Sequence, residues 1–318
     1  MKRTACRSAA LLATVGAMLV AARESAAKPI PSAPIEAAIP AEATVKPKQP
    51  RRLLVFNTRQ GHAGAAQAAA KALDLMGQKT GAWTTTVSDD PAVFEPDSLK
   101  AFDAVCINNT SGFNPFGATP ARDAPKEEKD AAAQAAKRRE EAFLAYLRGG
   151  GGVVGFHSAT DSRSAILVEV FSGKFSGHPW VGNETVTVRI DDPNHALTRC
   201  FAGQAFEIQD EIYQFTDPSH ADFRKKLRVL LTLDMMRTAR KGSRADHDYA
   251  VAWIKPFGQG RVFYSSLGHN PHVFWDPRIL RFYQDGIQFA LGDLEADARP
   301  SAEVGIQAPP LPPAPAKP

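Results

Sequence analysis

Short apolar segments alternate with helical patterns through the first half of the chain. Four segments have the length and the apolar or β-branched content expected of strands in a parallel sheet, at residues 52–57, 83–87, 102–107 and 153–157. Alanine-rich residues 63–76 and charged residues 125–147 predict helices between them, and the second helix runs into four glycines, Gly149–Gly152, which are a typical helix stop. This alternation predicts an α/β fold with a doubly wound, mostly parallel sheet.

The pattern changes after Trp180, where apolar and polar residues alternate as in half-buried strands. Further strands are expected at residues 184–190, 205–213, 227–233, 249–254 and 261–266. The turn Phe257–Gly260 predicts a hairpin between the last two strands, and residues 277–291 form a closing helix. We therefore expect additional antiparallel strands in the C-terminal half of one α/β domain, residues 51–298.

Both ends of the chain differ from this domain in composition. Residues 1–27 have a basic start, an apolar run too short to span a bilayer and a small-residue cleavage site, which predicts a signal peptide. Residues 28–50 are rich in Pro and Ala and predict an extended linker, and residues 299–318 predict a Pro-rich disordered tail. The sequence thus predicts an exported protein, periplasmic or secreted, whose ends pack against nothing.

Charge and cysteine content narrow the class of protein. The whole chain carries 38 basic and 34 acidic residues. Removing the predicted signal peptide leaves 34 against 33, a balance that argues against nucleic-acid binding. No second apolar run predicts a membrane span in the mature chain. Export permits a disulfide between Cys106 and Cys200, but the apolar surroundings of Cys106 favour a buried free thiol.

The histidines carry the strongest indication of a functional site. Six of the eight lie at or just after a predicted strand end or a glycine turn, and five of them fall in short motifs: Gly61-His62, Gly155-Phe156-His157, Gly177-His178, Asn194-His195 and Gly268-His269. Ligand crevices of open α/β sheets lie beyond the carboxyl ends of the strands, so these side chains predict one shared pocket. Histidine serves there as metal ligand, proton carrier or hydrogen-bond partner.

The segment around His157 is the most informative of these motifs. A strand that enters a tight turn and then a helix displays one side chain at the top of the sheet, as in a nucleophile elbow. Here His157, or Ser158 beside it, occupies that position. The alternative is a simple helix cap formed by Ser158 or Thr160. A serine nucleophile is disfavoured because the G-x-S-x-G pattern is absent.

Several motifs together resemble the ThuA-like (trehalose utilisation) family over residues 52–292. The resemblance rests on Gly155-Phe156-His157-Ser158-Ala159, Phe175-Ser176-Gly177-His178-Pro179, Asn194-His195-Ala196-Leu197-Thr198, Asp210-Glu211-Ile212-Tyr213, Gly260-Arg261-Val262-Phe263-Tyr264 and Leu267-Gly268-His269, with a looser match at Asn57–His62. It implies a class I glutamine amidotransferase-like, flavodoxin-like fold that has lost the amidotransferase cysteine. No cysteine stands at the elbow, so glutamine hydrolysis through a thiolate is not available.

The same resemblance implies a role in the use of disaccharides, glycosides or keto-sugars, beside a partner sugar dehydrogenase. It places six residues around one pocket: His62, His157, His178, His195, Glu211 and His269. An enzyme of carbohydrate utilisation is one interpretation, and a non-catalytic sugar-binding or accessory protein is the other. Catalysis requires an acid/base pair within reach of each other, whereas binding requires only hydrogen bonds.

Roles follow from the residue types. His157, Glu211 and His269 are the candidate catalytic residues, and the candidate substrate-binding residues are His62, His178, His195 and Trp180, whose ring offers a face to a sugar. Imidazoles with a carboxylate suit a divalent transition metal, with His157, His178, Glu211 and His269 as candidate ligands. Because no H-x-H or H-x-x-x-H pair occurs, the spacing alone does not indicate a metal, and metal-free acid/base chemistry stays open as the alternative.

Overall fold

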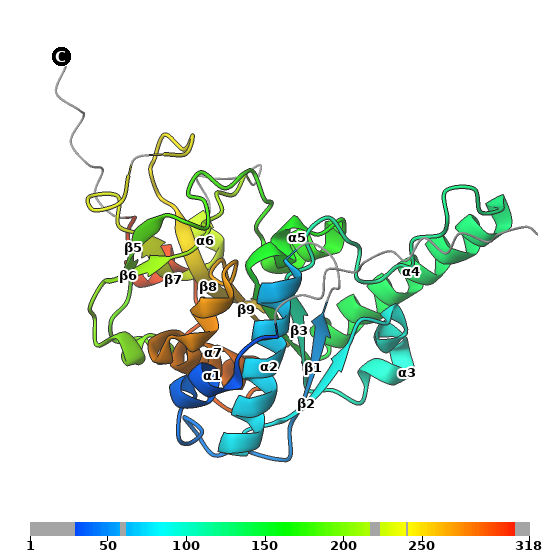
Figure 1. Cartoon of the computed structure of the whole chain (residues 1–318), viewed down its shortest axis with the longest axis horizontal. Helices are drawn as coiled ribbons and strands as arrows, with labels where there is room; N and C mark the ends of the chain where they lie inside the picture. Colours follow the sequence, from blue (N-terminus) through cyan, green and yellow to red (C-terminus); the bar gives the residue numbers. More distant parts are fainter. Residues whose placement is uncertain (1–28, 58–61, 217–222, 240, 309–318) are drawn as a thin grey trace, which may run out of the picture.

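A computed structural model describes residues 29–57, 62–216, 223–239 and 241–308. Its centre is a nine-stranded mixed sheet with the order β2-β1-β3-β4-β9-β8-β7-β5-β6 (Figure 1). The strands are β1 (Arg52–Asn57), β2 (Thr84–Ser88), β3 (Ala104–Asn108), β4 (Gly152–Phe156), β5 (Thr185–Ile190), β6 (Phe206–Gln209), β7 (Arg228–Leu233), β8 (Ala250–Phe257) and β9 (Gly260–Ser265).

The sheet has a parallel part and an antiparallel part. β2, β1, β3, β4 and β9 pair in parallel, whereas β8, β7, β5 and β6 continue the sheet from β9 by antiparallel pairing. The predicted fold class is therefore confirmed, including the antiparallel strands of the C-terminal half. β4 lies between β3 and β9 and is parallel to both, so the strand that leads into His157 is an inner strand of the parallel part, as its apolar sequence predicts.

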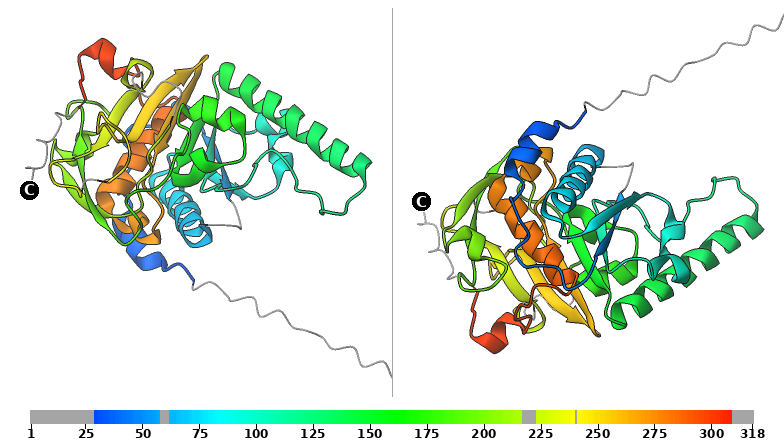
Figure 2. Two further views of the ribbon diagram at one scale, coloured as in Figure 1. Left: turned by 90° about the horizontal axis from the view of Figure 1, so that it is seen from above. Right: turned by 90° about the horizontal axis from the view of Figure 1, so that it is seen from below.

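Helices cover both faces of the sheet (Figure 2). They are α1 (Ser32–Ala38), α2 (Ala63–Thr80), α3 (Pro96–Leu99), α4 (Lys126–Arg148), α5 (Ala165–Phe171), α6 (Phe223–Lys226) and α7 (Pro277–Ala290). One core contains buried residues of α1, α2 and α7, and a second core on the other face contains those of α4 and α5. The inner parallel strands β1, β3, β4 and β9 are thus buried between the two cores, which explains their largely apolar sequences, whereas the edge strand β2 is polar and mostly exposed.

Residues 29–50 differ from the predicted extended linker. They form α1 and an ordered segment beside α7 (Figures 1 and 2), and the side chains of Ile35 and Ile39 are buried in the core. The backbone N–H of Thr44 donates to Gln288 Oε1 at 2.9 Å. The high Pro and Ala content predicted an extended linker, but the segment also contains isoleucines that are buried in the domain.

The C-terminal segment also packs further than predicted. Ser301 is fully buried, its N–H donates to the Leu227 carbonyl at 2.9 Å, and its Oγ accepts from Val229 N–H at 2.9 Å. The predicted disordered tail therefore does not begin at residue 299. Residues 309–318 and the predicted signal peptide, residues 1–27, lie outside the described residues. Within the described part, no helix is long and apolar enough to cross a membrane.

Both cysteines in the described part of the chain are free thiols. Cys106 is fully buried in β3, as its apolar surroundings predicted. Cys200 is partly buried in the short 3-10 helix η3 (Arg199–Phe201). The alternative of a Cys106–Cys200 disulfide is therefore not realised.

Candidate functional site

His157 occupies the elbow at the carboxyl end of β4. It starts the 3-10 helix η2 (His157–Asp161) with a φ of 44°, a left-handed backbone conformation that side chains rarely adopt. The close packing of β4 requires Gly155, because a Cβ atom there would lie 2.6 Å from the Phe171 ring and 3.0 Å from Tyr264. Backbone strain of this kind is concentrated at functional sites. It therefore agrees with a functional role for His157 at the carboxyl ends of the parallel strands.

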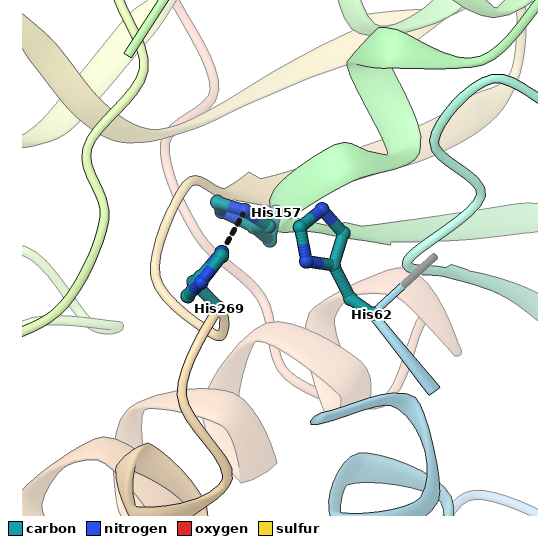
Figure 3. Close-up of side chains that lie close together, drawn as sticks. All are labelled: His62, His157 and His269. Atoms are coloured by element: carbon teal, nitrogen blue, oxygen red, sulfur yellow. Dashed lines mark hydrogen bonds between the residues drawn. The ribbon is translucent and has the colours of Figure 1, made fainter. Parts of the chain in front are cut away.

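Three histidines converge at the carboxyl ends of the parallel strands (Figure 3). His62 precedes α2, and His269 lies in the loop between β9 and α7. The ring centroid of His62 is 5.1 Å from that of His157 and 4.6 Å from that of His269. His269 Nδ1 lies 3.3 Å from His157 Nε2, and one nitrogen from each of the three rings falls within 4.8 Å of the others. We call these three residues the histidine cluster.

Glu211 closes the cluster on one side. Its Oε1 lies 3.4 Å from His157 Nε2 and 3.4 Å from His269 Nδ1. Its Oε2 lies 3.5 Å from Nδ1 of His178, whose side chain is half exposed. Glu211 therefore connects the buried His157 to a histidine that reaches the solvent.

Proximity shifts the pKa values of these groups. Burial, together with the neighbouring His157 and His269, lowers the pKa of His62 to about 4. Burial opposes ionisation of Glu211, but hydrogen bonds with His157 and His269 outweigh it and lower the pKa of Glu211. Hydrogen bonding to Glu211 raises the pKa of His269. The cluster thus combines an ionised carboxylate with His62 as a neutral imidazole near neutral pH.

Backbone contacts orient the His157 ring. His157 Nδ1 lies 2.8 Å from the Ser266 carbonyl oxygen, which can only accept, so Nδ1–H donates. Nε2 then faces Glu211 and His269. With a proton, Nε2 donates to the Glu211 carboxylate, and without one it offers the lone pair that a metal ligand or a general base requires. The Tyr213 ring packs at 4.2 Å from the His157 ring. Ser266 and Tyr213 therefore fix the direction in which His157 acts.

Asp210 holds the loop that carries His269. Its carboxylate is fully buried and accepts the backbone N–H groups of Gly268 at 2.7 Å, His269 at 3.4 Å and Asn270 at 2.8 Å. Burial raises the pKa of Asp210. The nearby His157 and the N–H donors of Gly268 and Asn270 lower it, but the effect of burial is larger. Gly182 completes the packing, since a Cβ there would lie 2.8 Å from His269 Cδ2.

The donor atoms fit a transition-metal ion. His157 Nε2, His269 Nδ1 and Glu211 Oε1 form a nearly equilateral triangle with sides of 3.3, 3.4 and 3.4 Å. Ligands at metal distances of about 2.0–2.1 Å in a tetrahedral site lie roughly 3.3–3.4 Å apart. His62 offers a further nitrogen within 4.8 Å of the other two histidines. The two nitrogens and the carboxylate oxygen of the triangle are donor types that suit Zn²⁺ and similar ions, and His62 is the nearby candidate for a further ligand.

The structure brings together five of the predicted site residues and separates two others. The five are His62, His157, His178, Glu211 and His269. Both ring nitrogens of His195 contact backbone instead, with Nε2 3.1 Å from Asp297 O and Nδ1 accepting from Leu197 N–H. Trp180 is buried, its ring packs against Tyr249 and its Nε1–H donates to Ala239 O.

The substrate contacts predicted for His195 and Trp180 therefore do not match the structure, because both side chains are used inside the fold. Sequence reasoning also missed Ser266, Tyr213 and Gly182 as parts of the site. Ser266 lies directly before the Leu267-Gly268-His269 motif, and that position was the only signal for it. Gly182 follows His178 by four residues, and its role depends entirely on the packing of His269.

Fold and site together define a doubly wound α/β protein whose strand-to-helix elbow after β4 carries His157. The family model for ThuA, described as trehalose utilisation, matches residues 52–290. The chain belongs to the ThuA family. None of the curated proteins matches it.

Solved structures agree with this assignment at the level of the fold. A ThuA-like protein from Bacteroides uniformis ATCC 8492 is 21% identical with a TM-score of 0.56, covering 77% of this chain and 93% of its own. A ThuA-like protein from Parabacteroides merdae ATCC 43184 is 14% identical with a TM-score of 0.50, covering 79% of this chain and 98% of its own.

Proposed function

We propose that this protein is a metal-dependent enzyme of carbohydrate utilisation, with the histidine cluster and Glu211 as its active site. The observation that carries the proposal is the triangle of His157, His269 and Glu211 donor atoms, with edges that match a tetrahedral metal site. The description of the family as trehalose utilisation supports a sugar as substrate. The substrate class is a disaccharide, a glycoside or its keto derivative.

The residues divide the chemistry between them. His157, His269 and Glu211 Oε1, with His62 beside them, would hold a divalent metal ion, which would supply Lewis acidity toward a sugar oxygen. Glu211 accepts a proton at the carboxylate oxygen that faces away from this centre, Oε2. His178 lies 3.5 Å from that oxygen with half of its side chain exposed, so it relays the proton to solvent.

One observation favours a metal-free alternative. Glu211 raises the pKa of His269, so His269 can serve as a proton donor beside the His157 acceptor without a metal ion. In that case His157, Glu211 and His269 act directly as acid and base. The third interpretation, a sugar-binding accessory protein for a partner sugar dehydrogenase, uses the same side chains as hydrogen-bond partners only.

The predicted signal peptide supports a place for this activity outside the cytoplasm. We propose that the mature protein is periplasmic or secreted and that it meets its sugar there. Fractionation of cells that express the full chain, followed by N-terminal sequencing of the mature protein, tests export. An uncleaved chain in the cytoplasm would contradict it.

The metal content of purified protein is the decisive first measurement. We expect about one divalent ion per chain, lost in His157→Ala and kept in His272→Gln. His272 is the matched control because its ring contacts the Gln209 carbonyl and not the cluster. Trehalose, glucosides and keto-glucosides are then titrated with and without metal. Turnover that survives EDTA would support acid/base chemistry, and sugar binding without turnover would support the accessory role.

A further inference from the structure

A cleft of 660 Å³ opens between the N-terminal segment, the segment after β5 and helix α7. Val45, Ala196 and Leu294 contribute apolar walls, and Arg199, Arg281 and Asp285 contribute charges. None of the residues of the histidine cluster lines it. Its volume lies within the range of small-molecule sites, which is roughly 300–1,000 Å³.

Two sequence features that the histidine cluster does not use build this cleft. One is the Asn194–Thr198 motif, which leads directly into Arg199. His195 fixes that segment through its contacts with Asp297 O and Leu197 N–H. The other is residues 41–45, predicted as a linker, whose Thr44 hydroxyl donates to Asp285. The first wall is thus held by a side chain outside the cleft, and the second by a hydrogen bond between two of the residues that line it.

Among the described residues, the charges in the cleft leave one cation without a counterion. Arg281 Nε lies 3.5 Å from Asp285 Oδ1, and Arg278 pairs with Asp276 at 2.6 Å. Within the described ranges, Arg199 forms no ion pair, although it lies close enough to Asp285 to affect its ionisation. The side of the cleft formed by Arg199 and Arg281 therefore carries a net positive charge.

We propose that this cleft is a second ligand site, for a small anionic molecule. Its carboxylate or phosphate group pairs with Arg199 beside Arg281, and its apolar body rests on Val45, Ala196 and Leu294. The guanidinium group suits both oxyanions, because its planar set of N–H donors matches their geometry. Apolar walls with a few placed polar groups are the usual composition of such sites.

Isothermal titration calorimetry on the full chain tests the proposal with inorganic phosphate, glucose 6-phosphate, gluconate and glucose. We expect at least one anion to bind and glucose to bind more weakly, and the two sugar anions distinguish phosphate from carboxylate as the recognised group. Arg199→Ala should weaken anion binding by about tenfold or more, since it removes a charge-assisted hydrogen bond. Arg122→Ala, an exposed arginine that does not line the cleft, should leave binding unchanged.

Two further variants locate the bound anion. Ala196→Phe fills the cleft and should abolish binding, with thermal unfolding as the check on its fold. His157→Ala should keep anion binding, because the cleft does not include the histidine cluster. The proposal is overturned if no anion binds, if glucose binds as tightly as the anions, if Arg199→Ala binds like wild type, or if His157→Ala loses binding. Since this site is separate, its failure leaves the proposed enzymatic function standing.

Discussion

The buried Asp210 carboxylate accepts a 2.7 Å hydrogen bond from the backbone N–H of Gly268. This contact joins the residue that follows β6, at one edge of the sheet, to the loop that follows β9, in its middle. The next residue after Asp210 is Glu211, and the next after Gly268 is His269. One backbone-to-carboxylate contact thus sets the distance between two members of the candidate active site.

Asp210→Asn should weaken metal binding about 10- to 100-fold, the usual cost of removing a group that orients a metal ligand. The asparagine amide carries no charge, and its N–H group would face the backbone N–H groups of the loop, which need an acceptor. Competition titration with a zinc chelator measures the affinity. Glu207→Gln, an exposed change on β6, is the control and should bind metal like wild type. Equal affinity in both variants would show that the loop does not depend on Asp210.

Glu211→Gln should lower turnover of the sugar substrate by roughly 10²–10⁴-fold, because the carboxamide cannot accept a proton. His178→Gln should cause a smaller loss, since solvent can replace a half-exposed relay. Steady-state rates of both variants, with thermal unfolding as the check on folding, measure the difference. A Glu211→Gln enzyme that turns over at the wild-type rate would remove Glu211 from the proton path.

Asp285 should make stability depend on pH. Burial raises its pKa to about 6 from 3.8, so the folded state binds a proton that the unfolded state has released between these values. The contribution of Asp285 to the free energy of unfolding therefore falls as pH rises from about 4 to about 6, by on the order of 2 kcal/mol.

Urea unfolding of wild type and Asp285→Asn at pH 4 and pH 7 isolates this contribution. From pH 4 to pH 7 the free energy of unfolding of wild type should fall relative to that of the variant, because Asp285 ionises in this range and the amide does not. Parallel pH dependences of the two proteins would mean that Asp285 titrates alike in the folded and unfolded states.

Ile35→Ala should destabilise the protein by about 2–4 kcal/mol, the range for truncating a fully buried aliphatic side chain. Glu36→Ala, one residue further along α1 and exposed, should change the free energy of unfolding by less than about 0.5 kcal/mol. Chemical denaturation of both variants measures the contrast. Two equally small effects would show that α1 contributes little to the stability of the domain.

The sequence determined the strands, the parallel part of the sheet and the place of His157. Continuous apolar runs such as residues 153–156 are stable only when both faces are covered, so local pattern and fold agree. Because parallel strands share one carboxyl edge, His62, His157 and His269 could be assigned to one pocket before any coordinates. The observed strand β6 ends at Gln209, whereas residues 205–213 were predicted, because Asp210 accepts a hydrogen bond from the loop after β9 instead of continuing the strand.

Tertiary structure alone decided which polar residues join the site. The motif around His195 also places a histidine in a turn after a predicted strand, yet its ring contacts backbone groups of Leu197 and Asp297. Trp180 neighbours His178 along the chain but is buried against Tyr249. Residues 29–50 have the composition of a linker, yet Ile35 is buried in the hydrophobic core. Periodicity and composition report local preference, whereas these outcomes depend on which distant groups lie within contact distance after folding.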